Sequence, residues 1–259
     1  GAANTWFDDN GKSGAAAIVF DLMENRKGTQ FFSDMTLGSA PSGREMGHTG
    51  HFWSHLWGGV GAARGGELGM QTFMREMNPI FTLERQPDGR MVFQGNVGEK
   101  GKKGDLRTKW DSTGARLLQL CVPRRNLYIT GKATPANSHL TQARINQILK
   151  AGRLDVDEEA RAKLAIPEIL ALLEDPLPPV RALAARTLAE RNINCVDKLI
   201  PMLDSENRYA RCGAAEALCK AGFGSKPAAD KLISMMAVDK DVTFQTYAIA
   251  ALINRDKER

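Results

Sequence analysis

From residue 153 onward, apolar positions recur at helical spacing in short segments that polar turns separate. The segment IPEILALL at 166–173 aligns with VDKLIPML at 196–203, an offset of 30 residues, and ADKLISMM at 229–236 is a third copy after a slightly longer step. Each copy leads through a polar turn into a second, mostly Ala-rich helical pattern. A unit this small cannot bury its apolar stripe alone, so the pattern predicts stacked helical pairs, an α-solenoid.

The turns of these copies carry helix-start residues. Asp175 precedes Pro176, and Asp204 precedes Ser205, which are residue types favoured at helix N-termini. An arginine follows at the same place in the first two copies, Arg181 and Arg211. We interpret these arginines as structural residues that tie adjacent turns together, in preference to contacts with a ligand.

The run DPLPPVRALAARTL, from Asp175 to Leu188, resembles the HEAT-like repeats of about 30 residues. This resemblance implies a solenoid fold for the C-terminal part of the chain. Its functional implication is broad, since such repeats occur in scaffolds, in lyases and as appendages of enzymes.

The first half of the chain also shows helical patterns, with one predicted hairpin. Apolar segments follow the polar openings 10–14 and 110–114, and further helices are expected over 29–37, over 51–57 and over 68–77, the last ending at Pro79. Residues 81–85 and 90–93 flank Gln86-Pro87-Asp88-Gly89, which is a strong turn signal. We therefore expect a small β-hairpin near residues 81–93.

The openings at 10–14 and 110–114 resemble the inner-helix starts of the α/α toroid in terpenoid cyclases and protein prenyltransferases. The runs GHTGHFWSHLWG at 47–58 and YITGK at 128–132 resemble more closely an uncharacterised bacterial domain family that joins a toroid-like segment to HEAT-like repeats. The likeness implies an all-α protein with an incomplete α/α-toroid-like segment over 1–135 and a HEAT-like solenoid over 136–259. That family brings no established activity to this chain.

The sequence departs from the enzymes of the toroid class. Prenyltransferases hold zinc through an Asp-x-Cys pair, whereas Asp111 is followed by Ser112 and Thr113. Hopene-type cyclases use an Asp-x-Asp-Asp motif, of which Asp8-Asp9 is only a fragment. A complete ring also needs about a dozen helices, more than this half of the chain provides, so the resemblance carries over no catalytic residue.

Three of the four histidines, His48, His51 and His55, lie close together and are the best chemical lead. In a helix they would fall within roughly 60° of one another, opposite an apolar side that includes Trp53 and Trp57. His51 and His55 are four residues apart, a spacing at which two imidazoles can bind one metal ion such as zinc. The alternatives are a metal-free binding or acid–base role, or a purely structural one.

Two aspartates, Asp9 and Asp111, lie just before predicted inner helices. In a toroid such helix starts converge on a central cavity, where they could contact a ligand together with the histidine cluster. Helix capping explains the same residue types at the same places and is the preferred interpretation.

Composition excludes some classes of protein and leaves others open. The net charge of +5 is mild, and the sequence lacks the stacking aromatics and modules of nucleic-acid-binding proteins, which argues against such a partner. No run is long and apolar enough to span a bilayer, and no secretion signal is seen. Because the chain starts abruptly, we expect it to be a trimmed form, which leaves its compartment open.

The four cysteines show no metal or disulfide spacing, and free thiols are expected.

These patterns favour a non-enzymatic protein- or peptide-binding or scaffolding module of a larger bacterial protein. Binding is expected on the concave repeat surface and beside the His-Trp segment, and no cofactor is required. The alternative is a toroid-type enzyme acting on a carbohydrate or isoprenoid-like substrate, with His51 and His55 near the chemistry. A third possibility is a metal-dependent variant of that enzyme, with zinc bound through His51 and His55. Whether the chain is an enzyme, and its oligomeric state, stay open at this stage.

Overall fold

The computed structural model describes residues 7, 10–40, 52–92, 111–124, 130–131, 139–221 and 225–257, with the backbone alone at 10, 52–55 and 255–257. Helices make up most of these residues, which confirms the all-α fold class. Residue contacts divide the chain into two compact units, and the division along the sequence falls between Val156 and Asp157. Each unit is described below by itself.

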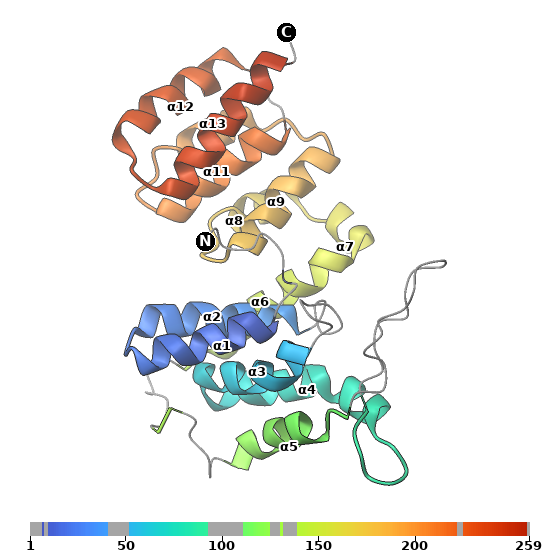
Figure 1. The fold of residues 1–259 in the computed structure, drawn as a ribbon. Coiled ribbons are helices and arrows are strands. Elements are labelled where there is room, and N and C mark those ends of the chain that lie inside the picture. The colour runs from blue at the N-terminus through green and yellow to red at the C-terminus, as the bar shows by residue number, and fades with distance from the viewer. Residues whose placement is uncertain are drawn as a thin grey trace. The chain divides into compact units, whose positions relative to one another are not determined.

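The first unit is a cluster of helices with short 3₁₀ turns (Figure 1). Its elements are α1 (Asn10–Leu22), α2 (Arg26–Ser39), α3 (Phe52–Ala62), η1 (Ala63–Gly65), α4 (Gly66–Glu84), α5 (Thr113–Cys121), η2 (Val122–Arg124) and α6 (Gln142–Val156). Helix α1 packs against both α2 and α3, and α5 packs against α3. The helices expected from the openings at 10–14 and 110–114 are both present.

Glycines bring α1 and α3 together at backbone distance. A Cβ placed on Gly61 would lie 2.2 Å from the Cα of Gly14, and a Cβ placed on Gly14 would lie 2.4 Å from the carbonyl oxygen of Trp57. Backbone atoms cannot move aside as a flexible side chain can, so any larger residue would force the helices apart. These glycines are therefore requirements of packing.

Two buried ion pairs join distant parts of the first unit. The guanidinium of Arg116 on α5 donates to both carboxylate oxygens of Glu84 at the end of α4, at 2.5 and 2.7 Å, and both side chains are buried. Arg64 bonds to Asp21 at 3.0 Å and to Thr130 at 3.1 Å. A buried pair of this kind is costly to break, because removing one partner leaves an uncompensated charge.

Helix α6 packs with the first unit. Its apolar residues Ile145, Ile148 and Leu149 are buried, and Arg144 and Arg153 form ion pairs with Asp34 on α2 and Glu76 on α4. The domain boundary expected after residue 135 stays a prediction, and the structure adds that the helix following it contacts α2 and α4.

The predicted hairpin near 81–93 needs a correction. Its turn forms, with Gln86 N–H donating to Arg90 O at 2.8 Å, and isolated antiparallel bridges pair Arg85 with Met91 and Val92 with Asp111. However, α4 continues through Pro79 to Glu84, so residues 81–84 are helical. Tertiary packing accounts for the difference, because the helical conformation buries Phe81 under the guanidinium of Arg116, 4.8 Å from the ring centre.

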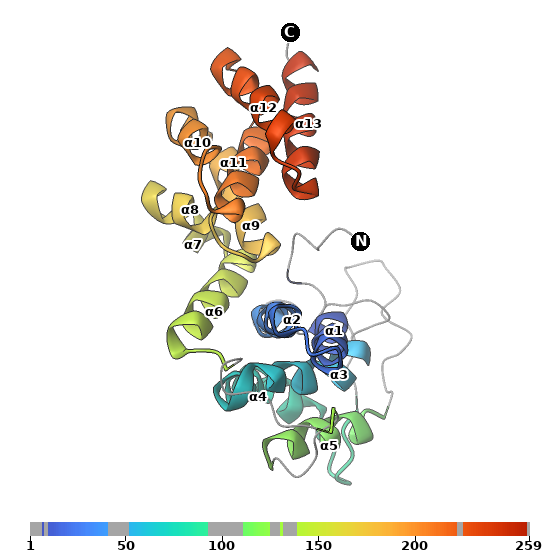
Figure 2. The same ribbon diagram turned by 90° about the vertical axis from the view of Figure 1, so that its left-hand side faces the viewer.

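The second unit contains the predicted repeats. Its helices are α7 (Glu158–Ala162), α8 (Ile166–Leu172), α9 (Pro178–Glu190), α10 (Val196–Met202), α11 (Arg208–Ala221), α12 (Lys226–Val238) and α13 (Val242–Lys257). Figure 2 shows α9, α11 and α13 in succession, each backed by its own first helix. The core repeats with the sequence, since Ile169, Leu199 and Leu232 hold the same position in the first helices and all are buried.

Candidate functional site

The turn that opens each second helix is capped in the same way in all three repeats. Asp175 accepts a hydrogen bond from Leu177 N–H at 2.8 Å, Ser205 from Asn207 N–H at 3.2 Å and Asp239 from Asp241 N–H at 2.9 Å. Each side chain satisfies a backbone donor that the turn would leave unpaired. Asp175 thus closes the turn two residues before α9 begins at its N-cap, Leu177, and its counterpart in the second repeat is Ser205.

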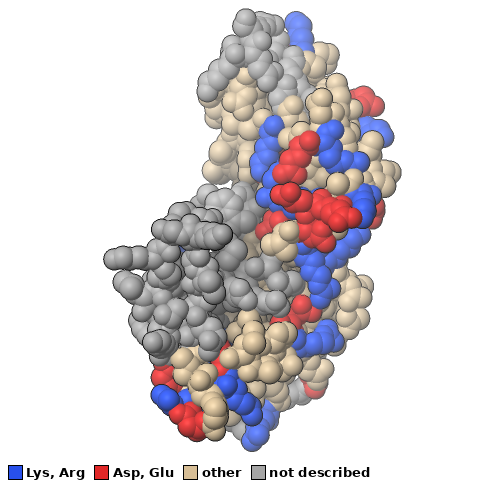
Figure 3. Space-filling model, turned by 90° about the vertical axis from the view of Figure 1, so that its right-hand side faces the viewer, with Lys and Arg blue, Asp and Glu red and all other residues tan. Residues whose placement is uncertain are grey.

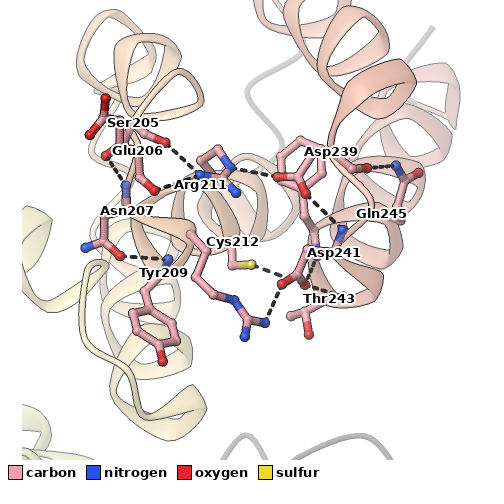
Figure 4. Close-up of polar contacts among 12 residues, drawn as sticks. Ser205, Glu206, Asn207, Tyr209, Arg211, Cys212, Asp239, Asp241, Thr243 and Gln245 are labelled. Carbon is pink, nitrogen blue, oxygen red and sulfur yellow. Dashed lines mark hydrogen bonds and ion pairs between the residues drawn. The ribbon is translucent and has the colours of Figure 1, made fainter.

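A long side chain from the first turns of the second helix closes each of these turns. Arg181 donates to the carbonyl oxygens of Asp175 and Pro176 at 2.7 and 3.0 Å, and Arg211 donates to those of Ser205 and Glu206 at 2.8 and 3.1 Å. The structural role predicted for both arginines is confirmed. In the third repeat Gln245 takes this place, with bonds to the carbonyl oxygens of Met236 and Asp239 (Figure 4).

The arginines of the second repeat also reach the third. Arg211 Nε donates to Asp239 Oδ2 at 2.7 Å, Arg208 pairs with Asp241, and Cys212 Sγ lies 3.7 Å from Asp241 Oδ1 (Figure 4). These contacts join the start of α11 to the start of α13. They fix the register of one repeat on the next.

Tyr209 lies between two guanidinium groups on the same edge. Its ring centre is 5.5 Å from Arg181 Cζ on α9 and 5.4 Å from Arg208 Cζ on α11. The Tyr209 side chain is half-buried, and the Arg208 side chain is 55% exposed. We call the group Arg181, Arg208, Tyr209, Arg211, Asp239 and Asp241 the turn edge. It combines a rigid framework with an aromatic ring and a cation that solvent can reach.

The contacts of Asp241 shift its own pKa and that of the neighbouring Cys212 thiol in opposite directions. Burial acts to raise the pKa of Asp241, but the backbone N–H groups of Phe244 and Thr243 and the Arg208 guanidinium together lower it below its ordinary value. Burial, helped by the nearby Asp241 carboxylate, raises the pKa of the Cys212 thiol to about 11. At neutral pH Asp241 is therefore a carboxylate and the adjacent Cys212 is a protonated thiol, which is a poor nucleophile.

A second polar contact links α11 and α13 further along the helices. Glu216 is buried, and its Oε1 lies 3.3 Å from Lys220 Nζ. Burial and the adjacent Glu216 raise the pKa of Tyr247 on α13. Asn254 Nδ2 donates to Cys219 O at 3.4 Å near the end of the helix pair. The helices are thus joined by polar contacts along most of their length.

Most of the site residues predicted in the first half cannot be compared with this geometry. Asp9, His48 and His51 lie outside the described residues, and His55 and Trp53 belong to α3 at positions where only the backbone is described. Trp57, on the same helix, is half-buried. The convergence of these side chains on one ligand therefore stays a prediction.

Asp111 is described, and it lies one residue before Ser112, the N-cap of α5. Its carboxylate accepts a hydrogen bond from Thr113 N–H at 2.9 Å, and the side chain is exposed. The hydroxyl and then the backbone N–H of Thr113 lower the pKa of Asp111. Asp111 thus bonds to the start of α5 from one residue before the N-cap, Ser112, and a ligand contact of Asp111 stays a prediction.

The candidate metal and thiol chemistry can be followed only over part of the chain. Among the described residues, no group of three or more His, Cys, Asp or Glu side chains is placed to hold a metal ion. The cysteines are free thiols as expected, with Cys195 and Cys212 buried, Cys219 half-buried and Cys121 exposed. The described part of the chain also contains no helix with the length and hydropathy that a bilayer crossing needs.

Sequence reasoning did not assign roles to Tyr209, Arg208, Asp239 or Asp241. The available signal was the position of Asp239 and Asp241 in the third turn, matched against the capping residues of the earlier turns. Their partners on α11 could not be found this way, because Arg208 and Arg211 lie about 30 residues away and meet the aspartates only after the repeats stack.

Two family models match the chain. One, described as a domain of unknown function (DUF6288), matches residues 1–131, and the other, described as HEAT repeats, matches residues 166–253. The first agrees with the resemblance to an uncharacterised domain, and the second agrees with the predicted repeats. Neither the curated proteins nor the solved structures give a match.

Proposed function

The chain belongs to the DUF6288 family, and from this premise we propose that it is a non-enzymatic module that binds protein or peptide through the turn edge of its repeats. Repeats of the HEAT type commonly form helical scaffolds that mediate protein interactions. The proposal narrows this general role to one surface, the edge that carries Tyr209 and Arg208.

One observation carries the proposal: the exposed Arg208 side chain and the half-buried Tyr209 ring are presented on a framework of paired charges, to which Arg208 itself belongs through Asp241. Tyr and Arg are enriched at the energetically dominant positions of protein interfaces. Here the hydrogen bonds of Arg211 and the ion pairs with Asp239 and Asp241 hold the edge in place. A partner would therefore pay little ordering entropy in binding it.

The distribution of charge also favours a protein partner over a polyanion. Basic and acidic side chains are interspersed on the described surface that Figure 3 shows, and no large area of one sign dominates it. A nucleic-acid-binding surface is expected to collect Lys and Arg on one face. An interspersed surface suits a partner with its own mixed charges.

The test uses the full chain and a library of random displayed peptides. We expect selection to yield a shared peptide pattern whose affinity falls at least about tenfold in Tyr209→Ala and in Arg208→Ala, which is the loss of one moderate interface contact. Lys226→Ala is the matched control, because Lys226 is an exposed cation of the same unit that pairs only within α12. Peptides that ignore the Tyr209 and Arg208 substitutions would refute the proposal, as would a selection without a shared pattern.

A further inference from the structure

The outward face of α13 is apolar and lacks the cover that the same face has in the preceding repeats. Val242, Ile249 and Ile253 are 78%, 46% and 52% exposed, and Thr246 between them is exposed too. We call Val242, Thr246, Ile249 and Ile253 the α13 stripe. Exposed apolar side chains in a continuous row, rather than singly, are typical of an interaction surface.

The α13 stripe occupies the same positions in its helix as a face of α11 that is covered by the next repeat. Aligning Arg211 with Gln245 places Thr246, Ile249 and Ile253 on Cys212, Ala215 and Cys219 of α11. Cys212 contacts Asp241, the residue before α13, Cys219 contacts Asn254 of α13, and Ala215 is fully buried. The α13 stripe therefore corresponds to the face of α11 that packs against the next repeat, and none of the described helices covers it.

The side chains of the α13 stripe are larger than those at the corresponding positions of α11 and α9, and this difference limits which helix can pack against the stripe. The covered face of α11 is made of Cys and Ala, and the corresponding face of α9 consists of Ala182, Ala185 and Ala189. Small side chains let the next helix approach closely, whereas isoleucines at these places hold a neighbour further away. A further repeat with the spacing of the earlier ones fits this face poorly.

The spacing of the stripe suits a second helix of the same kind. Its members are separated by four, three and four residues, which is the a/d spacing of a two-helix coiled-coil seam, with β-branched residues at every position. Residues 242–254 contain no charged side chain, so the flanks of the stripe offer nothing to an acidic or basic partner. An equally uncharged apolar helix face matches it.

We propose that the α13 stripe is a self-association surface that takes the α13 stripe of a second copy of this chain, in antiparallel order. A two-fold axis between Tyr247 and Ala248 places Val242 opposite the second copy's Ile253, and Thr246 opposite the second copy's Ile249. Every member then meets another member, as a contact between identical surfaces requires. This assembly is separate from the turn edge and goes beyond the proposed binding function.

The main test is sedimentation of the full chain over a range of concentrations. We expect a reversible monomer–dimer equilibrium. We expect the double substitution Ile249→Lys/Ile253→Lys to weaken it at least about 100-fold, because it would place four lysine charges of one sign, without partners, in an apolar seam. The control is Ile233→Lys/Val238→Lys on α12, which replaces apolar residues that are 57% and 68% exposed but lie off the stripe. The control should keep the equilibrium of the unaltered chain.

Cross-linking tests the antiparallel order. A mixture of Thr246→Cys and Ile249→Cys chains should form a disulfide between positions 246 and 249 on oxidation, identified by mass spectrometry so that Cys121 is not mistaken for it. A chain that stays monomeric at every concentration would overturn the proposal, even if another protein then covers the stripe. A dimer that survives the lysine substitutions, or that links position 246 mainly to itself, would overturn it as well.

Discussion

The two compact units of this chain solve the problem of holding helices together by different means. In the first unit, contacts join residues far apart in the sequence: Gly14 meets Gly61, and Glu84 pairs with Arg116. In the second unit, each repeat bonds to its own turn and to the next repeat, as Arg211 does with Ser205 and Asp239. The repeats therefore distribute their stabilising contacts along the unit, whereas the first unit concentrates them in a few places.

The largest effect is expected from Glu84→Gln in the first unit. This change leaves the fully buried Arg116 guanidinium without its carboxylate, which typically costs about 3–5 kcal/mol of unfolding free energy. The control is Asp88→Asn, since the pair of Asp88 with Arg90 is more than half exposed on both sides and solvent screens it, so its loss should change stability little. Urea denaturation measures the unfolding free energy of both variants. Equal losses of unfolding free energy would contradict the view that the first unit depends on a few concentrated contacts.

Glycine substitutions compare close packing in the two units. Gly61→Ala in the first and Gly213→Ala in the second should each cost about 1–3 kcal/mol, because the new Cβ would lie 2.2 Å from Gly14 Cα and 2.1 Å from Leu173 O. Gly114→Ala is the control, since its Cβ meets nothing within 4 Å. Thermal melting of the three variants checks this, and a loss in Gly114→Ala as large as in the others would refute the packing explanation.

Removing one repeat contact should have a smaller and more local effect. Arg211→Ala loses the bonds to two carbonyl oxygens and to Asp239, and we expect a cost of about 1–2 kcal/mol because water replaces part of them. Hydrogen exchange should speed up in α11 and α13 and stay unchanged in α1. Faster exchange in α1 would show that the units do not respond separately, and Lys226→Ala serves as the neutral control.

Acid should weaken the second unit through Asp241. Its folded pKa lies below the ordinary value of 3.8, so the carboxylate stabilises the fold above that value, and the contribution is lost as the pH falls through 3.8 toward the lower folded pKa. In Asp241→Asn this part of the acid sensitivity should disappear. Melting temperatures between neutral pH and pH about 3 measure it, with Asp230→Asn on the exposed face of α12 as the control.

The smallest effect is expected from removing metal ions from the purified protein. If the chain is a binding module without a cofactor, elemental analysis of purified protein should find no stoichiometric zinc, and a chelator should leave the melting temperature unchanged. Zinc that is retained by the chain and lost in a His51→Ala/His55→Ala double variant would instead support the metal-dependent alternative.

The sequence predicted the structure of the second unit more completely than that of the first, and the reason is physical. The repeats were read correctly, and so was the tie made by Arg181 and Arg211, because each contact spans only five or six residues within one turn. Phe81 was misassigned to a strand, because its helical state depends on Arg116, 35 positions along the chain. Of the predicted site residues, Asp111 bonds to the first residue of α5, only two positions away, which is a local contact.

The sequence by itself determined that the chain is helical, that its second half repeats, and where each repeat begins, since helix periodicity, capping and turn closure are local properties of the chain. Only the tertiary structure decided that Tyr209 lies between Arg181 and Arg208, that Asp239 and Asp241 pair with α11, and that the α13 stripe is uncovered. These features depend on which surfaces meet when the helices stack, and the order of residues along one helix does not specify its neighbour.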